Sequence, residues 1–541
     1  MIPVRSLVSM LLSAIAVLVT GGCTQKNQQD FYRSGIIYCS ESNPINFNPQ
    51  LDTSGTTADA SSHQIYGRLL DFDPDSGRIE AGLASSWKVS DDGLNYEFQL
   101  HKGIEFHTTE YFTPTRTFNA DDVIFSIDRW RLPSHPYHYV SGGRYAYFES
   151  LGIADNIQSV TRLNSYRVQI KLINRDSSFL ANLATDFSVI LSEEYAKQLM
   201  EEGVPERIDH YPIGTGPFKF QSYRKDHYIR YKRHENYWRD EARSERLIYD
   251  ITPKSSLRLA KLITGECDAI AFPGQTEVEV IRQREQLEVA EKPGLNIGFW
   301  AFNTQKAPFD NPDVRRALAF AIDKNTLLEA VYFDSAVRAK TLLPTASWAH
   351  QRDADDTAYN PVLARKLLND AGVAEGFRMT IWAMPVERAY NPNAAKMAEL
   401  MQRYLADVGI RAEIITYDWT TFRRHLREGA HDSVLIGWSA DNGDPDNFYR
   451  PLLSCGAIPS GTNRAMWCNR RYDQLINAAL KTEDIEQRKL IYQQVNRLLY
   501  EQLPLVPLAH AFRYQAHNSG LSGMTINPYG GINFAGVEKK L

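Results

Sequence analysis

The chain has 541 residues, of which 43% are hydrophobic and 23% are charged, and its formal net charge is −5. This length is too great for a single apolar core, so two or three domains are expected. The composition is that of a globular protein, and the slightly acidic balance excludes the basic field that nucleic-acid binding requires.

The N-terminal segment has the pattern of a signal peptide, which we place at residues 1–22. Arg5 precedes an apolar run over residues 7–19, too short to span a bilayer, and small residues follow it. Small residues directly before Cys23 resemble a bacterial lipoprotein signal, which would leave Cys23 lipidated at the mature N-terminus. Thr20 stands where such a signal usually has Leu, and ordinary secretion with an unmodified Cys23 is the alternative.

Four further cysteines remain in the mature chain: Cys39, Cys267, Cys455 and Cys468. An even number in an exported chain indicates two disulfides, and four cysteines allow three pairings. Cys455 and Cys468 are close in sequence, but spacing alone leaves the pairing open. No Cys-x-x-Cys or His-x-x-x-His spacing accompanies them, which argues against a metal site.

Alternation and capping residues predict several elements in chain order. Residues 36–39 and 96–100 are predicted as strands, and Asn119 as the N-cap of the helix that follows it. Residues 161–173 are predicted as another alternating strand. A second unit is predicted to begin near residue 293, with a strand over residues 296–303.

The segment from 377 to 441 has the most readable pattern. Strands are predicted over residues 377–384, 412–417 and 434–438. Helices are predicted over residues 394–408, with apolar residues at helical spacing, and from Asp418, as N-cap, to residue 428. This order is β-α-β-α-β, which implies parallel strands joined by right-handed crossovers.

Two charged residues follow strands of this unit. Arg388 comes after the first strand and Asp441 after the third, so both lie beyond the carboxyl ends of parallel strands, where ligands bind in open α/β sheets. A guanidinium and a carboxylate on one edge complement a zwitterion. Spacing alone leaves open that the two side chains pair with each other or face solvent.

The acid-rich loop that contains Asp441 permits other interpretations. It and residues 71–77 carry spaced acids, but Asp446 and Ser76 stand where a calcium loop of the EF-hand type needs Gly. For residues 71–77 we predict a hairpin turn. An enzyme is not predicted, because residues 437–441 lack the second Gly of a nucleophile elbow and no other catalytic motif is present.

Two long motifs carry a resemblance to a known family. Residues 384–393, MPVERAYNPN, and 437–448, GWSADNGDPDNF, closely resemble the periplasmic dipeptide-binding proteins of bacterial ABC importers, in extracellular solute-binding protein family 5. Shorter matches lie at 38–41, 54–57, 118–123, 213–218 and 294–297. The similarity covers nearly the whole mature chain. Close relatives include haem- and glutathione-binding lipoproteins and Sap-type proteins linked to antimicrobial peptides.

The resemblance implies an α/β fold of the periplasmic binding protein type II class, a two-lobe clamp built from three domains with mixed sheets. The lobe 1 core domain is expected to be discontinuous, over residues 31–66, 216–293 and 512–541. Residues 67–215 would form an extra domain of lobe 1, and residues 294–511 would form lobe 2.

The resemblance also implies residue roles. Asp441 is expected to bind the ammonium of a peptide and Arg388 its carboxylate. Further contacts are expected from Ser54, Gly55 and Thr56 in the other lobe and from Trp438. The family's disulfides map onto Cys39–Cys267 and Cys455–Cys468. One departure is Ala440, where the dipeptide-binding protein has Gly, and we expect its methyl group to shift the ligand slightly.

The predicted function is therefore the substrate-binding component of an ABC importer. It would capture short peptides, most readily dipeptides, and deliver them to an inner-membrane permease with cytoplasmic ATPases. We expect a monomer in the periplasm, anchored through Cys23, without cofactor, metal or nucleic-acid partner. The alternatives are a haem- or glutathione-binding lipoprotein, with His135 and His138 as the close histidine pair, and a Sap-type antimicrobial-peptide-binding protein.

Overall fold

The structure is a computed structural model that describes residues 35–73, 77–240, 242–373, 376–527, 529 and 531–540. The predicted signal peptide and Cys23 lie outside the described residues. Within the described ranges, no helix is long and apolar enough to cross a membrane.

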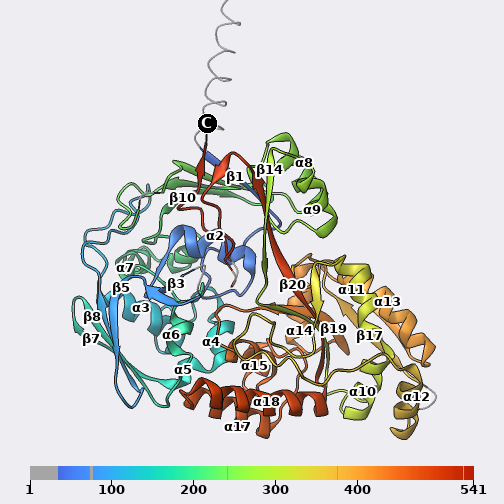
Figure 1. The fold of residues 1–541 in the computed structure, drawn as a ribbon. Coiled ribbons are helices and arrows are strands. Elements are labelled where there is room, and N and C mark those ends of the chain that lie inside the picture. Colours follow the sequence, from blue (N-terminus) through green and yellow to red (C-terminus); the bar gives the residue numbers. More distant parts are fainter. Residues whose placement is uncertain are drawn as a thin grey trace, which may run out of the picture.

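A long mixed sheet runs through the molecule (Figure 1). In spatial order its strands are β10 (Phe218–Arg224), β11 (Tyr228–Arg233), β12 (Arg246–Ile251), β1 (Gly35–Ser40), β13 (Ala269–Ile270), β20 (Leu505–Asn518), β15 (Asn296–Phe302), β19 (Ser433–Ser439), β17 (Arg378–Ala383) and β18 (Arg411–Ile415). Two further strands, β14 (Leu287–Pro293) and β16 (Ala336–Arg338), pair with β20. β20 therefore belongs to both halves of the sheet.

Two large apolar cores lie on the two sides of this shared strand. One core collects buried residues between 36 and 271 and between 521 and 537, and the other collects buried residues between 295 and 511. We call the parts of the molecule built on them the first unit and the second unit. In Figure 1 the first unit carries the blue to green elements and the second the yellow to orange ones, with β20 in red between them. The predicted three-domain boundaries stay a prediction.

The predicted β-α-β-α-β unit is confirmed in the second unit. β17 pairs in parallel with both β18 and β19, and the two connections contain α13 (Ala394–Asp407) and α14 (Trp419–Arg427). The apolar stripe of α13 is buried, as its helical spacing predicts. This arrangement brings the carboxyl ends of β17 and β19 to one edge of the sheet.

Other predictions for single elements are mostly confirmed. β1, β15 and β6 (Asn95–Leu100) are strands, and Asn119 caps α3 (Ala120–Arg131) through a capping box. The single strand predicted over residues 161–173 is wrong.

That stretch is an antiparallel hairpin of β7 (Ile157–Asn164) and β8 (Arg167–Leu172). Asn164 turns the chain, because its Oδ1 accepts a hydrogen bond of 2.8 Å from the backbone N–H of Tyr166. The alternation shifts by one residue at this short turn and then resumes, and the prediction of a single strand overlooked that break.

Both disulfides implied by the resemblance are present. Cys39 is joined to Cys267, with Cα atoms 5.9 Å apart, and Cys455 to Cys468, with Cα atoms 4.5 Å apart. The first bond connects β1 to a segment 228 residues later, and the second closes a loop of sequence separation 13.

Candidate ligand-binding site

A cavity of about 170 Å³ lies between the first and second units, and most of the predicted binding residues line it. Arg388, Asp441 and Trp438 reach it from the second unit, and Ser54 and Gly55 from the first. Thr56 does not line the cavity; it is buried, with its hydroxyl 3.3 Å from that of Ser54. Five of the six predicted contact residues are therefore brought together.

Two of the three acids in the loop after β19 are structural. Asp444 forms an ion pair of 2.8 Å with Arg488, on α18 (Ile485–Gln502). Asp446 pairs at 2.8 Å with Arg450, one turn further along α15 (Asp446–Leu453). These ion pairs hold the loop in place. They explain two of its carboxylates as structural, so neither a metal ion nor a catalytic role is needed to account for them.

The third acid, Asp441, has no ion pair among the described residues and faces the cavity. Its backbone N–H donates to Asn447 Oδ1 at 2.9 Å, which holds the turn, while its Oδ2 is buried and has no hydrogen-bond partner in the described structure. Burial and the negative charge of Asp186 raise the pKa of Asp441 well above its usual value. A buried carboxylate oxygen without a donor is costly, so this position favours a cationic ligand group.

Asp186 keeps a negative charge in the same region. Burial opposes its ionisation, but His63 and Arg68 outweigh burial and lower the pKa of Asp186. Its Oδ1 lies 2.8 Å from His63 Nε2 and 3.8 Å from Arg68 Nη1. The wall of the cavity near Asp441 is therefore acidic.

Arg388 lies across the cavity from Asp441. It adopts neither of the two arrangements that spacing left open, which were a pair with Asp441 and exposure to solvent. It does not pair with Asp441, and it is only 8% exposed. Its Nη1 donates at 2.8 Å to Glu41, which follows β1 in the first unit. Burial opposes its charge, but Glu41 raises the pKa of Arg388 above the usual value. A guanidinium has five N–H donors, so the contact with Glu41 leaves donors for a second carboxylate.

The predicted effect of Ala440 on the ligand does not agree with its position. Ala440 is fully buried in the core of the second unit, and its N–H donates to Leu295 O at 2.7 Å. It is not among the residues that line the cavity. Its methyl group packs into this core and not against a ligand.

Three cavity arginines were not predicted from the sequence: Arg423, Arg464 and Arg513. Arg423 Nη1 donates at 2.8 Å to Asp52 of the first unit. Arg423 lies on α14, and Arg464 lies in the loop closed by the Cys455–Cys468 bond. No motif surrounds Arg464, so its position between the two cysteines was the only sequence feature that could have indicated a role at the site.

Aromatic rings form much of the remaining wall. They are Phe187, Phe272, Phe299, Tyr390, Trp419, Trp438 and Tyr529. Trp438 is fixed by a 3.3 Å hydrogen bond from its Nε1 to Asn447 Oδ1. Gly437 must lack a side chain here, because a Cβ atom would lie 2.3 Å from the ring of Tyr390. The wall can therefore contact apolar side chains, while charged groups hold the ends of a ligand.

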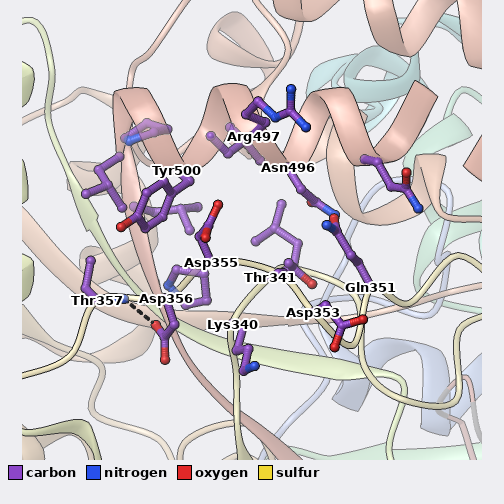
Figure 2. Close-up of a pocket in the computed structure, with 18 residues that line it drawn as sticks. Lys340, Thr341, Gln351, Asp353, Asp355, Asp356, Thr357, Asn496, Arg497 and Tyr500 are labelled. Atoms are coloured by element: carbon purple, nitrogen blue, oxygen red, sulfur yellow. Dashed lines mark hydrogen bonds between the residues drawn. The ribbon is translucent and has the colours of Figure 1, made fainter. Parts of the chain in front are cut away.

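A second cavity, of about 190 Å³, lies in the second unit beside α18 (Figure 2). None of the predicted binding residues lines it. Its polar groups contact one another or nearby residues: Asp356 accepts from the Thr357 N–H at 2.7 Å, and Asn496 Nδ2 donates to Gln351 at 3.1 Å. It is a separate feature and not part of the site between the units.

The residues considered for haem or calcium lie elsewhere. Neither His135 nor His138 lines the cavity between the units, and His138 Nδ1 lies 2.8 Å from Arg129 O. β3 (Leu70–Phe72) and β4 (Ile79–Ala81) pair antiparallel, as the predicted hairpin requires, although residues 74–76 between them lie outside the described residues. In the described ranges no group of three metal-ligating side chains occurs.

Comparisons with known proteins agree with this geometry. Residues 78–460 match the family described as bacterial extracellular solute-binding proteins, family 5 Middle. The chain is 41% identical to the dipeptide-binding protein of Escherichia coli K12, over 97% of each chain, and 40% identical to Heme-binding protein A of Haemophilus influenzae, over 98% of each. The crystal structure of a Pseudoalteromonas dipeptide binding protein in complex with Met-Leu superposes with a TM-score of 0.91 at 47% identity, covering 94% of this chain and 100% of that one. The chain therefore belongs to family 5 of the bacterial extracellular solute-binding proteins.

Proposed function

We propose that this protein is the substrate-binding component of an ABC importer and that it binds short peptides, most readily dipeptides, by their charged termini. Membership of the family makes it a binding protein and not an enzyme, and its fold is that of the type II periplasmic binding proteins. The observation that carries the proposal is the buried, unpaired carboxylate of Asp441 in a cavity that also contains Arg388.

In this proposal the peptide ammonium binds Asp441. It supplies the hydrogen-bond donors that Oδ2 lacks and the positive charge that this acidic wall favours. The peptide carboxylate binds Arg388, which shares its donors between the ligand and Glu41. Ser54 and Gly55, at the start of α2 (Gly55–Ile65), contact the peptide from the first unit.

Binding both ends also selects for length. A peptide that reaches only Arg388 leaves the buried carboxylate of Asp441 without a cationic partner, and one that reaches only Asp441 leaves its own carboxylate without a guanidinium. An unpaired buried charge costs roughly 3–5 kcal/mol. The peptide backbone and termini are common to all dipeptides, so side chains are free to vary against the aromatic wall. The dipeptide-binding relatives, one of them in complex with Met-Leu, support this ligand class.

The haem alternative has less support at the site. Heme-binding protein A is about as similar in sequence as the dipeptide-binding protein. However, the residues that line the cavity include no histidine and no cysteine. Charged groups for two peptide ends are present instead, so peptides are the better match.

The protein acts in the periplasm, and its two disulfides fit that oxidising compartment. The finer points belong to the proposal: a lipid anchor on Cys23, a monomeric state, and delivery to an inner-membrane permease with cytoplasmic ATPases. The sequence pattern before Cys23 supports the anchor.

The proposal is tested by titration calorimetry of ligand-stripped protein with Ala-Ala, Ala-Ala-Ala and haem. Ala-Ala is expected to bind more tightly than the tripeptide, and Asp441→Ala and Arg388→Ala are each expected to weaken Ala-Ala about tenfold or more, with unchanged circular dichroism. As a control, Asp355→Ala alters an exposed carboxylate of the second cavity (Figure 2) and should change nothing. Haem binding without peptide binding, or unchanged affinity in both site variants, would refute the proposal.

A further inference from the structure

The charges of the cavity are not evenly paired. Arg388 is paired with Glu41 and Arg423 with Asp52. Arg464 also lines the cavity, but its guanidinium makes no hydrogen bond or ion pair with any of the described residues. Only its backbone O is engaged, accepting from His431 Nε2 at 2.7 Å.

Among the four arginines that line the cavity, Arg513 also has no side-chain hydrogen bond with the described residues, but its charged neighbours differ from those of Arg464. The negative charges of Asp59 and Asp186 act on Arg513. No carboxylate acts on Arg464 in this way; burial and the charges of Arg423 and Arg427 together lower its pKa to about 9. It therefore stays mainly protonated at neutral pH, in surroundings that disfavour its charge.

The neighbours of Arg464 add positive charge. Arg423 and Arg427 lie one turn apart on α14, and Arg144 of the first unit acts on Arg427 in the same direction. Glu149 and Glu428 oppose this effect on Arg427 only weakly. Among the residues that the structure describes, Asp52 is the one carboxylate that forms an ion pair with this group, at Arg423. These arginines therefore carry more positive charge than Asp52 neutralises, and a further negative charge is favourable at Arg464.

The wall beside this charge suits a short side chain. Trp419 packs near Arg423, whose guanidinium carbon lies 5.8 Å from the ring centroid, and Tyr390 and Thr462 line the same part of the cavity. The methylene groups of an acidic side chain can pack against these rings while its carboxylate meets the guanidinium.

We propose that Arg464, with Arg423 beside it, forms a carboxylate subsite for a side chain of the bound peptide, so that the protein prefers peptides containing Glu or Asp over peptides with the matching amide. This inference rests on the proposed function, because Asp441 and Arg388 must hold the two termini for a side chain to reach Arg464.

The test compares isosteric peptides by titration calorimetry at pH 7: Ala-Glu with Ala-Gln, and Glu-Ala with Gln-Ala. At one of the two positions the Glu peptide is expected to bind about tenfold or more tightly than the Gln peptide. Arg464→Gln is expected to bring that ratio to about one. Arg403→Gln, which alters an exposed arginine of α13, is the matched control and should preserve every affinity.

The outcomes separate this inference from the proposed function. If Ala-Ala binds but Glu and Gln peptides bind equally in the unaltered protein, the subsite is refuted and the proposed function stands; this comparison requires no variant to fold. A ratio that persists in Arg464→Gln also refutes it. So does an equal loss for all peptides in that variant, which would place the terminal carboxylate at Arg464. If no dipeptide binds, both proposals fail.

Discussion

At the scale of single residues, three aspartates of one loop have different roles although their side chains are chemically identical. Asp444 and Asp446 each face an arginine and hold the loop, while Asp441 faces the cavity with one oxygen unsatisfied. The sequence predicted that Asp441 would face a ligand through its position after a strand. It did not reveal the partner of Asp444, because Arg488 is 44 residues further along the chain.

The raised pKa of Asp441 predicts how peptide binding depends on pH. A peptide ammonium favours the ionised carboxylate, so binding lowers this pKa and releases a proton. Affinity should therefore fall as pH is lowered from 7 to 5, by at most about tenfold per pH unit. Calorimetry in buffers of different ionisation enthalpy measures the released proton directly. Asp441→Asn should abolish the release, and a release that survives in this variant would contradict the assignment.

The same shift has the opposite sign for stability. A carboxyl group whose pKa is raised by folding contributes stability below its unfolded pKa, and this contribution is lost as pH rises through the folded pKa. In the ligand-free protein, Asp441→Asn should therefore raise the melting temperature more at pH 8 than at pH 5. An equal effect at both values would show that the carboxyl is ionised without cost.

At the scale of elements, the sequence predicted the segment between β17 and β19 best. Each of its elements has its own local signal, such as the Asp418 cap or the apolar stripe of α13. The β7–β8 hairpin was missed, because the turn at residues 165–166 is only two residues long and alternating strands flank it directly. Arg464 was missed for another reason, because its position depends on the path of a loop. A disulfide and packing set that path, and the spacing of residues in the sequence reveals neither.

The loop between Cys455 and Cys468 should depend on its disulfide for stability. Crosslinking a loop of this length stabilises a protein by about 3 kcal/mol, chiefly by restricting the unfolded chain. The double variant Cys455→Ser and Cys468→Ser should therefore unfold at a lower denaturant concentration. A midpoint equal to that of the oxidised parent would show that the loop is held by packing alone.

At the scale of the whole molecule, ion pairs join the two units across the cavity. Glu41 and Asp52 of the first unit contact Arg388 and Arg423 of the second, each at 2.8 Å, and Asn442 Nδ2 donates at 2.9 Å to Asn182. These contacts connect the two units directly. A peptide carboxylate therefore binds to the donors of Arg388 that its contact with Glu41 leaves free.

These two ion pairs predict the behaviour of a double variant. Replacing Glu41 with Gln and Asp52 with Asn removes both ion pairs, so the ligand-free protein should have a larger radius of gyration in small-angle scattering. Ala-Ala should restore the smaller value by bridging the units. A single variant, Asp444→Asn, removes an ion pair within the second unit only and should leave the radius unchanged. Identical scattering for all three proteins would contradict the role of the two contacts.

The course of β20 has a mechanical consequence. At Phe512 this strand pairs with Pro293 of β14, at the place where the chain passes between the units, and the next residue, Arg513, lines the cavity. A ligand charge in the cavity thus acts one residue away from the backbone that connects the two units. No relay of side chains stands between the ligand and this connection.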